Sequence, residues 1–465
     1  MKRDKSSRRA FVKLAAGSSI ATAVSPTFLA GARAQELQRP ARPISANERI
    51  GLATIGMGII GFIDTETALL VPGVELVAAA DLYTGRLGRV NELFGSGVAV
   101  TRDYREILTR PDVDAVIIST PDHWHAQIAV DALDAGKHVY LEKPMVQVIG
   151  EGPLVIDAQQ RTGLVLQVGS QFASSMLYEK AADLYASGAI GQLNQIEASS
   201  NRQSSIGAWQ YSVPPDASPQ TVDWDRFLGN APRRPFDPVR FFRWRNYWDY
   251  GTGLAGDLFV HLFTGIHRIV ETPGPERVFS TGGLRFWKDG RDVPDVVLGL
   301  FGYPETESHA DFTVALQSNL ADGSGGGSSF RFIGSEGVMT ITGSSVSVTR
   351  RPMRPPTEEQ LVRGYNSVDT WAEPVRQAFV EQYRRDHPVP FVPEMGETRE
   401  YSVPEGYDDR LDHLHNFFAS IREGAPNVED AVFGYRAAAP SLLSNLSYLE
   451  DKVYKWDPVE MRVLE

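Results

Sequence analysis

Apolar and polar positions follow two different periods in the first third of the chain. Short apolar runs, each expected to be a buried strand, lie at 50–55, 74–80, 97–101, 114–119, 137–141 and 163–168. Segments with helical periodicity separate these runs. Strands that alternate with helices are typical of a doubly wound α/β fold. The pattern therefore predicts a Rossmann-type parallel sheet over residues 50–168.

The alternation stops after residue 168, where the strand-like segments begin to follow one another. Helices are expected at 174–187, 254–271, 409–422 and 429–450, and strands at 192–200, 277–288, 296–303, 309–317, 329–334 and 337–349. Gly323–Ser329 is predicted to be a hairpin tip, residues 203–250 form an insert rich in Trp, Pro, Arg and Tyr, and 351–405 carry no clear pattern. This favours an α+β second domain with a largely antiparallel sheet.

The first apolar run leads directly into the glycine-rich stretch Gly56-Met57-Gly58-Ile59-Ile60-Gly61. In a strand–turn–helix unit, the first glycine allows the tight turn and the second lets a pyrophosphate approach the backbone. The third lets the helix pack against the strand, with its first amides facing the phosphates. These six residues are therefore predicted to bind a dinucleotide.

An acidic residue follows at the distance expected for ribose binding. The second strand ends in Asp81, twenty residues after Gly61. A carboxylate there accepts hydrogen bonds from ribose hydroxyls and repels a 2′-phosphate, so NAD is the predicted cofactor. Arg86, in the next helical segment, could offset this repulsion, so NADP stays possible.

Two loops follow later strands of the predicted sheet. After the fourth strand comes Ser119-Thr-Pro-Asp-His-Trp-His125, in which Thr120, Pro121 and His125 are expected to contact the cofactor or cap the next helix. The His-x-His spacing lacks a nearby carboxylate or thiolate, so no metal site is predicted. After the fifth strand come Glu142 and Lys143, both placed toward the cofactor. An ammonium group there can bind a substrate hydroxyl and exchange its proton.

A largely apolar helix is expected at 254–271, and it carries one polar stripe. Asp257, His261, Thr264 and Arg268 share a helical face. An aspartate four residues before a histidine can hydrogen-bond the imidazole and raise its basicity. The pair is therefore either an acid/base pair in a cleft or a satisfied interior pair.

The first 34 residues match an export signal. Ser7–Lys13 contains the twin arginines Arg8 and Arg9, and Ala32–Ala34 offers a small-x-small cleavage site. The apolar stretch between them is short and contains Pro26, which makes it a poor membrane span. The sequence predicts export in the folded state by the twin-arginine translocase, to the periplasm or another extracytoplasmic space. A basic disordered tail is the alternative.

Composition excludes several classes of partner. The chain contains no cysteine, so it has neither a disulfide framework nor a lipidation site. The leader carries seven basic residues and one acid, and its removal would take the net charge from −12 to −18. A body this acidic argues against nucleic acid and anionic membranes as partners and favours a neutral substrate.

These patterns divide the chain of 465 residues into five parts. They are a twin-arginine signal peptide at 1–34, an extended arm or loose linker at 35–49, a dinucleotide-binding Rossmann domain at 50–168, an α+β domain for substrate binding and oligomerisation at 169–450, and a C-terminal tail at 451–465. Two folded domains are the default for a chain of this length.

Together these stretches resemble the glucose–fructose oxidoreductase / inositol dehydrogenase / MocA (Gfo/Idh/MocA) family. The matching pieces lie at 56–61, 119–125, 135–144, 251–261, 334–337 and 412–424, in the family's order. The resemblance implies that Lys143 is the catalytic lysine and that Asp257 and His261 are the acid/base pair. Further candidates for substrate binding are Gln171, Arg245 and Tyr250.

The resemblance also implies a class of reaction. Members of the family mostly oxidise or reduce sugars and polyols with NAD or NADP, often as homo-oligomers, and some exported relatives keep the nucleotide bound. A subset cleaves glycosidic bonds without net redox change. We therefore expect an exported oxidoreductase with a tightly held NAD(P). A redox-neutral glycosidase or lyase and a non-catalytic sugar-binding protein are the alternatives.

Overall fold

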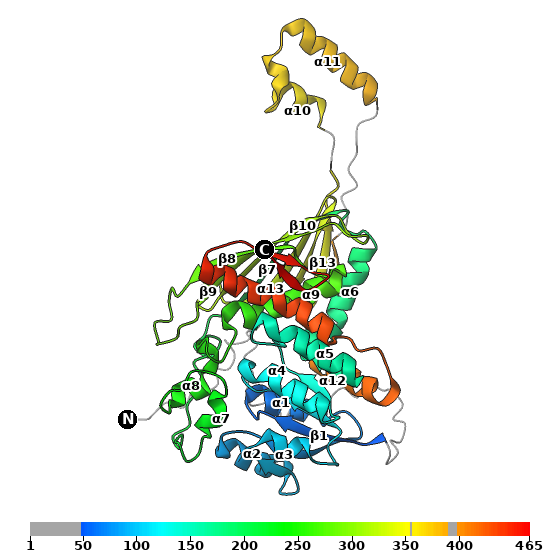
Figure 1. Cartoon of the computed structure of the whole chain (residues 1–465). Coiled ribbons are helices and arrows are strands. Elements are labelled where there is room, and N and C mark those ends of the chain that lie inside the picture. Colours follow the sequence, from blue (N-terminus) through cyan, green and yellow to red (C-terminus); the bar gives the residue numbers. More distant parts are fainter. Residues whose placement is uncertain (1–47, 354–355, 389–397) are drawn as a thin grey trace, which may run out of the picture.

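The computed structural model describes residues 48–353, 356–388 and 398–465 and contains two sheets with helices packed between and around them (Figure 1). The predicted signal peptide and almost all of the predicted arm lie outside these residues. Within the described ranges, no helix combines the length and the hydropathy needed to cross a bilayer.

The first sheet is the predicted parallel sheet. Its strands are β1 (Ile50–Ile55), β2 (Val74–Ala80), β3 (Ala99–Thr101), β4 (Ala115–Ile118), β5 (His138–Leu141) and β6 (Leu166–Val168). All pairs are parallel, and the order is β3-β2-β1-β4-β5-β6. The strand order reverses between β1 and β4, which is where such sheets bind nucleotides.

Helices cover both faces of this sheet. They are α1 (Ile59–Ala68), α2 (Thr84–Phe94), α3 (Tyr104–Leu108), α4 (His125–Asp134), α5 (Gly152–Thr162) and, from much later in the chain, α12 (Asp409–Glu423). Leu414, Phe417 and Phe418 of α12 are fully buried in one cluster with Ile50 and Leu52 of β1. The first domain is thus completed by a helix that the sequence analysis had placed in the second.

The second sheet is the predicted, largely antiparallel one. Its strands are β7 (Leu193–Asn201), β8 (Arg277–Gly283), β9 (Val296–Tyr303), β10 (Phe312–Asn319), β11 (Gly327–Gly334), β12 (Gly337–Thr342), β13 (Ser345–Arg350), β14 (Arg399–Ser402), β15 (Tyr454–Asp457) and β16 (Arg462–Leu464). Their order is β14-β13-β12-β11-β7-β10-β9-β8-β15-β16, and the β7/β10 pair is parallel.

Two expectations about this sheet are wrong. Gly323–Ser329 is not a hairpin tip, because β7 lies between β10 and β11: Ala198 of β7 pairs with both Leu316 and Phe330. Residues 451–465 are not a free tail, because β15 pairs with β8 and buries Trp456. Both errors concern pairings between strands that are distant in the sequence.

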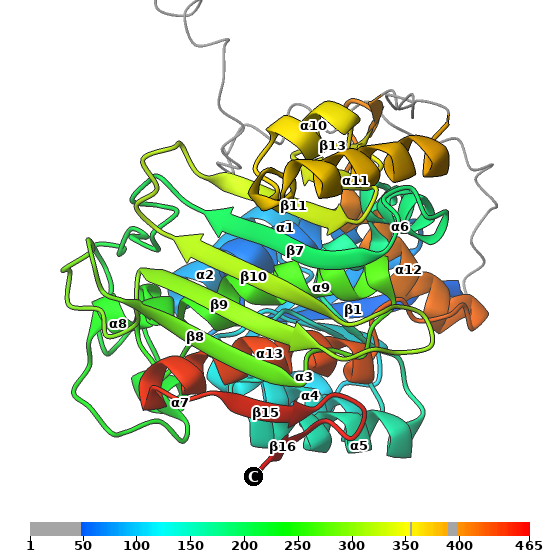
Figure 2. The same cartoon turned by 90° about the horizontal axis from the view of Figure 1, so that it is seen from above.

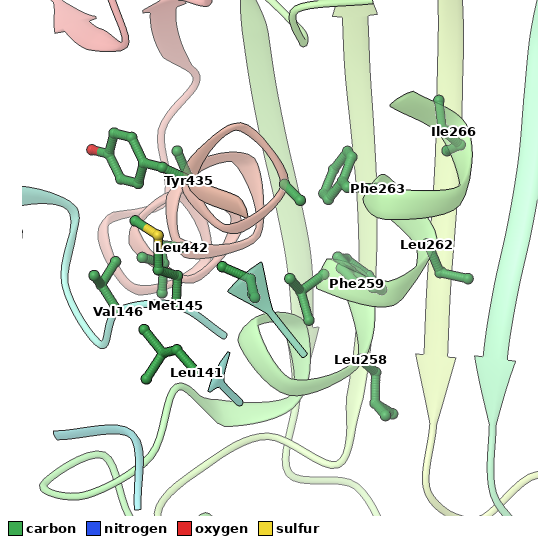
Figure 3. Close-up of a cluster of buried hydrophobic side chains, with 14 of the residues drawn as sticks. Leu141, Met145, Val146, Leu258, Phe259, Leu262, Phe263, Ile266, Tyr435 and Leu442 are labelled. Carbon is green, nitrogen blue, oxygen red and sulfur yellow. The ribbon is translucent and has the colours of Figure 1, made fainter. Parts of the chain in front are cut away.

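Three long helices pack against the second sheet: α6 (Met176–Ala186), α9 (Val260–Val270) and α13 (Ala431–Glu450). Figure 2 shows α9 and α13 behind the strands, on the side that faces the first domain. Figure 3 shows Met145 and Val146 of the loop after β5 near Leu442 of α13, and Phe263 of α9 belongs to the same buried cluster. This shared core fixes the two domains relative to each other.

The aromatic insert forms a lobe against the first domain (Figure 1). It contains the short helices α7 (Trp224–Leu228) and α8 (Pro238–Phe242). Val222 pairs with Tyr83 just after β2, and the Tyr83 hydroxyl donates to Asp216 Oδ1 at 2.6 Å. The lobe is therefore ordered, as predicted, and it is attached next to Asp81.

Residues 351–405 contain two helices that stand away from the body (Figure 1). They are α10 (Glu358–Arg363) and α11 (Glu373–Asp386), and α11 has no buried residue in the structure. They lie between β13 and β14 in the chain, so they extend from the edge of the second sheet.

Candidate functional site

The glycine-rich loop has the geometry that its three glycines predict. Gly56 has φ +94°, and a Cβ on it would lie 2.7 Å from the backbone of Ser119. A Cβ on Gly61 would lie 2.0 Å from the Gly56 oxygen, so the close packing of α1 requires glycine. A Cβ on Gly58, in contrast, would meet no atom within 4 Å. The second glycine therefore borders open space, as a site for a pyrophosphate requires.

The surroundings of this loop fit a dinucleotide. The first-turn amides of α1, including those of Ile59 and Ile60, have no acceptor within the helix and face the end of β1. The Thr120 hydroxyl, at the end of β4, is buried without a hydrogen-bond partner among the described residues. Met57, whose amide donates to Asp81 Oδ2, and Pro121 lie close to these groups in the chain. These groups would hold the phosphates of the nucleotide.

Asp81 lies where the ribose carboxylate is expected, but its oxygens are already engaged. Oδ2 accepts from the Met57 amide and Oδ1 from the Tyr83 amide, both at 2.8 Å. Arg86 Nη1 lies 3.3 Å from Oδ2, and its guanidinium stands over the Phe242 ring. Asp81 therefore ties the glycine-rich loop to β2, and the insert holds Arg86 beside it.

His125 contacts the loops that follow β4 and β5, and both of its ring nitrogens are engaged. Its Nδ1 lies 2.7 Å from the Pro144 oxygen and its Nε2 lies 2.9 Å from the Thr120 oxygen. Burial lowers the pKa of this histidine. The expected cofactor contact of His125 is therefore indirect, because its ring positions the backbone of Thr120.

A charged cluster bridges the two domains beyond the end of β5. We call it the lysine cluster: Lys143, Arg245 and Asp257. Lys143 Nζ donates to Asp257 Oδ1 at 3.0 Å, and Arg245 Nε donates to the same oxygen at 3.1 Å. Arg245 also stacks over the Trp244 ring at 4.2 Å. Burial alone would raise the pKa of Asp257, but Lys143 and Arg245 hold it well below its usual range.

The expected hydrogen bond between Asp257 and His261 is absent. The helix begins with a π-helical turn, η7 (Ala255–Phe259), which changes the i, i+4 geometry on which that prediction rests. Asp257 turns to Lys143 instead, and His261 Nδ1 is buried without a partner among the described residues. Burial and the Lys143 charge lower the pKa of His261 well below its usual value.

The two other candidate substrate-binding residues, Gln171 and Tyr250, lie in different surroundings. Gln171 begins the short helix η5 (Gln171–Ser174), whose Phe172 ring lies 5.5 Å from the His261 ring. Gln171 is therefore close to the site. Tyr250 is fully buried in the insert, with its ring 4.7 Å from Phe227. This aromatic packing adds no support for a contact with substrate, and the assignment of Tyr250 to substrate binding stays a prediction.

The structure adds residues to which the sequence analysis gave no role. Asp122 is buried and accepts from the Thr252 amide and hydroxyl at 2.9 and 2.8 Å, and burial raises its pKa to about 7. Tyr211 of the insert interacts electrostatically with both Arg245 and Asp257. The motif at 119–125 could have identified Asp122, whereas nothing local identifies Tyr211. No group of side chains suited to hold a metal occurs among the described residues.

The protein has the features of a two-domain, dinucleotide-binding α/β protein. These are the order of strands in the first sheet, the glycine-rich loop and the second domain. Residues 50–170 match the domain described as "Oxidoreductase family, NAD-binding Rossmann fold", and residues 202–275 match "Oxidoreductase family, C-terminal alpha/beta domain". Over these two ranges, which make up less than half of its length, the chain is similar to the Gfo/Idh/MocA oxidoreductases.

Known relatives cover parts of the chain. An alpha-N-acetylgalactosaminidase of Shewanella oneidensis is 35% identical over 173 residues, 33% of this chain and 37% of the relative. An inositol 2-dehydrogenase of Salmonella typhimurium is 33% identical over 140 residues, 30% of this chain and 42% of the relative. The chain thus spans less than half the length of either relative.

Solved structures match over nearly the whole fold. Levoglucosan dehydrogenase in complex with NADH and levoglucosan superposes with a TM-score of 0.61 over 88% of this chain and 99% of the other, at 18% identity. At this identity the match establishes a shared fold.

Proposed function

We propose that the protein is an oxidoreductase that transfers a hydride between a carbon of a sugar or polyol and the nicotinamide of NAD. The position of Lys143 carries this proposal. Ligands of open α/β sheets lie beyond the carboxyl ends of the strands. Lys143 follows β5 at that edge, and Asp257 of the second domain holds its Nζ at 3.0 Å. A lysine held there can meet a substrate hydroxyl beside the cofactor.

Each side chain then has a distinct role. A bound nicotinamide supplies the hydride acceptor or donor. In the oxidation, the carbon loses its hydrogen as hydride, and the hydroxyl proton passes to His261. This histidine is a competent base because its lowered pKa keeps it neutral. Lys143 donates a hydrogen bond to the substrate oxygen as it becomes a carbonyl. Asp257 and Arg245 keep Lys143 in place, and the reduction returns the proton by the same route.

The test needs the full-length protein and a panel of neutral sugars. A mass spectrum of the native protein should contain a bound nicotinamide dinucleotide. Addition of myo-inositol, D-glucose or levoglucosan should then convert bound NAD to NADH, seen as a gain in reduced-nicotinamide fluorescence. A protein that takes up no nicotinamide nucleotide, even when it is added, contradicts the proposal.

We infer further that the nucleotide stays bound and that the protein is exported with it. The twin-arginine pattern supports this, because that route carries folded proteins to a compartment without a comparable supply of dinucleotide. The insert also supports retention of the nucleotide, because the insert is hydrogen-bonded to loops that border the nucleotide site. The Thr84 amide donates to the Thr221 oxygen at 2.9 Å, and His123 Nε2 lies 2.7 Å from the Phe227 oxygen.

Retention predicts a single turnover for each site when one sugar and excess NAD are supplied. Sustained turnover should then require a second sugar or carbonyl compound that reoxidises the bound nucleotide. Steady accumulation of free NADH contradicts retention. Export is tested separately, by locating the protein after replacement of Arg8 and Arg9 with lysine, which should keep it in the cytoplasm. The family resemblance also predicts a homo-oligomer, and light scattering of the purified protein would test this by measuring its mass.

A redox-neutral glycosidase on the same site is the second candidate. Similarity to the alpha-N-acetylgalactosaminidase favours it, at 35% identity over 173 residues. The two functions separate in one assay with an aryl α-N-acetylgalactosaminide. Release of the aryl group without net change in the nucleotide indicates the glycosidase, whereas net nucleotide reduction by the free sugar indicates the oxidoreductase.

A further inference from the structure

Directly behind Lys143 lies a second group of charged side chains, which the sequence analysis did not identify. We call it the rear cluster: Asp64 of α1, Glu142 after β5, Glu429 before α13 and Arg410 of α12. The relative exposures of the three acids are 0%, 7% and 0%. All four residues come from different elements, so the cluster exists only in the folded protein.

The contacts of the rear cluster join it to the site. Arg410 Nη1 donates to Asp64 Oδ1 at 3.1 Å, and the Ser119 hydroxyl donates to Asp64 Oδ2 at 3.5 Å. Asp64 and Glu142 also interact with each other through their side chains. Glu142 Oε2 in turn accepts from the backbone amide of Lys143 at 3.3 Å.

Burial of two interacting acids favours a proton between them. An ionised carboxylate has no donor, so two carboxyl groups that hydrogen-bond each other hold at least one proton. The charge balance agrees. Arg410 is the one cation in an ion pair with these acids in the described chain, and Glu429 has no ion pair there at all. Buried charges without partners are costly, so protons remain.

Other titratable groups face the pair, and three of them, Lys143, His125 and Arg410, oppose the proton. The groups that face the pair are Tyr140 of β5, Lys143 after β5, His125 of α4, Arg410 of α12 and Glu429 before α13. Burial and the Asp64 charge raise the pKa of Glu142 to about 8, against the opposing effects of Lys143 and Arg410. Burial raises the pKa of Asp64 to about 6.

We propose that Asp64 and Glu142 share one proton and that this proton sets the charge beside Lys143, which makes both acids positioning residues for the lysine. While the proton is present, Glu142 is neutral and Asp257 is the carboxylate that pairs with Lys143. When it is lost, a second carboxylate stabilises the ammonium beside the substrate. The positive charge of Lys143 is then partly offset, so it stabilises the substrate oxygen less. The inference deepens the proposed function, because it assigns that site an alkaline switch.

The first test needs no substrate. Infrared difference spectra of the full-length protein report the carbonyl stretch of protonated carboxyl groups. In the wild type, a buried protonated carboxyl should lose its proton near pH 8, the pKa of Glu142. Glu142→Gln should remove this transition. Asp64→Asn should move it to lower pH, because an asparagine amide stabilises ionised Glu142. Glu151→Gln is the matched control: Glu151 accepts from the Gln147 and Val148 amides and should leave the transition unchanged.

The second test is the pH profile of nucleotide reduction, with whichever of myo-inositol, D-glucose and levoglucosan is oxidised. In the wild type we expect the rate to fall at alkaline pH, and we call this fall the alkaline limb. The alkaline limb should disappear in Glu142→Gln and move to lower pH in Asp64→Asn, even if the maximal rate of either variant is reduced. A merely structural role would lower the rate of both variants without moving the limb.

The two tests separate the two proposals. Absence of the infrared transition, or its survival in Glu142→Gln, overturns the shared proton. A transition that behaves as expected in a protein that oxidises no sugar upholds the shared proton and overturns the proposed function. Two variants whose alkaline limbs coincide with that of the wild type overturn the link to Lys143.

Discussion

The lysine cluster and the rear cluster are both buried and lie on either side of the end of β5, yet they hold charge in opposite ways. In the lysine cluster one carboxylate, Asp257, has two cations within 3.1 Å, and its pKa falls. In the rear cluster three acids have one guanidinium, and their pKa values rise.

The difference shows that two cations bound to one carboxylate can overcome the effect of burial on its pKa. Burial raises the pKa of Asp257, Asp64 and Glu142 alike. Two cations overcome it at Asp257, whereas Arg410 does not overcome it for the pair. One cluster is therefore held as ions, whereas the shared proton proposed for the other would be lost as the pH rises.

The largest expected effect is that of removing the Lys143 charge. Lys143→Met should lower turnover by about 10²–10⁴-fold, the range for a positioned proton-transfer group, while the nucleotide stays bound. Steady-state rates and native mass spectra check both parts. Lys137→Met is the matched control. Lys137 precedes β5 at the opposite end of the strand and bonds the Arg110 and Val113 oxygens at 2.8 Å. Its loss should cost stability and leave turnover in place.

The next-largest effect is on the free energy of unfolding, and it should differ between the carboxyl groups of Asp257 and Glu142. Asp257→Asn leaves two buried cations without their partner and should lower the free energy of unfolding by about 3–5 kcal/mol. Glu142→Gln replaces a neutral acid with an amide of the same shape, so its cost at pH 6 should stay below about 1.5 kcal/mol. Denaturant titrations measure both. Equal losses would mean that the two clusters do not differ in charge state.

The pH dependence of stability should have opposite signs in the two clusters. The pKa of Glu142 is raised from 4.5 to about 8, so its protonated form stabilises the fold below about pH 4.5, and this contribution is lost as the pH rises to 8. Asp257 has a lowered pKa, so its contribution is present above its usual range and is lost as the pH falls. From pH 5 to 8, the unfolding free energy of Glu142→Gln should therefore rise relative to the wild type. A constant difference over that range would contradict the shared proton.

The next prediction concerns His261, whose pKa depends on the charge of the lysine cluster. The sequence alone suggests that turnover falls on the acid side near the usual pKa of histidine. Burial and the Lys143 charge lower the pKa of His261 well below that value, so the acid limb should lie at lower pH. His261→Asn should remove this limb together with most of the rate. An acid limb at the ordinary histidine pKa would show that Lys143 carries no charge beside it.

The smallest expected effect is the choice of cofactor at Asp81, where a single carboxylate meets a single guanidinium. Denatured protein should release mainly NAD. Asp81→Ser should raise the affinity for NADP relative to NAD by about ten- to a hundredfold, because it removes a like charge from the 2′-phosphate. Arg86→Ala should act in the opposite direction. Release of mainly NADP from the wild type would show that Arg86 dominates the pair.

Local patterns predicted the parts of the site that depend on local geometry. The surroundings of the three glycines agree with the predicted loop, because the tight turn at Gly56 and the close packing at Gly61 are needs of the backbone itself. The place of Lys143 followed from its strand. The Asp257–His261 bond was wrong, because the π-helical turn at Ala255–Phe259 depends on how the helix packs.

The sequence by itself determined the parallel sheet, the class of the second sheet, the glycine-rich loop and the end of the strand that carries Lys143, because apolar periodicity and glycine requirements are properties of neighbouring residues. The tertiary structure alone decided which charges meet. It brought Asp257 and Arg245 to Lys143, and it brought Arg410 to Asp64. Protonation depends on burial and on the cations within a few ångströms, and folding sets both by joining elements that are distant in the chain.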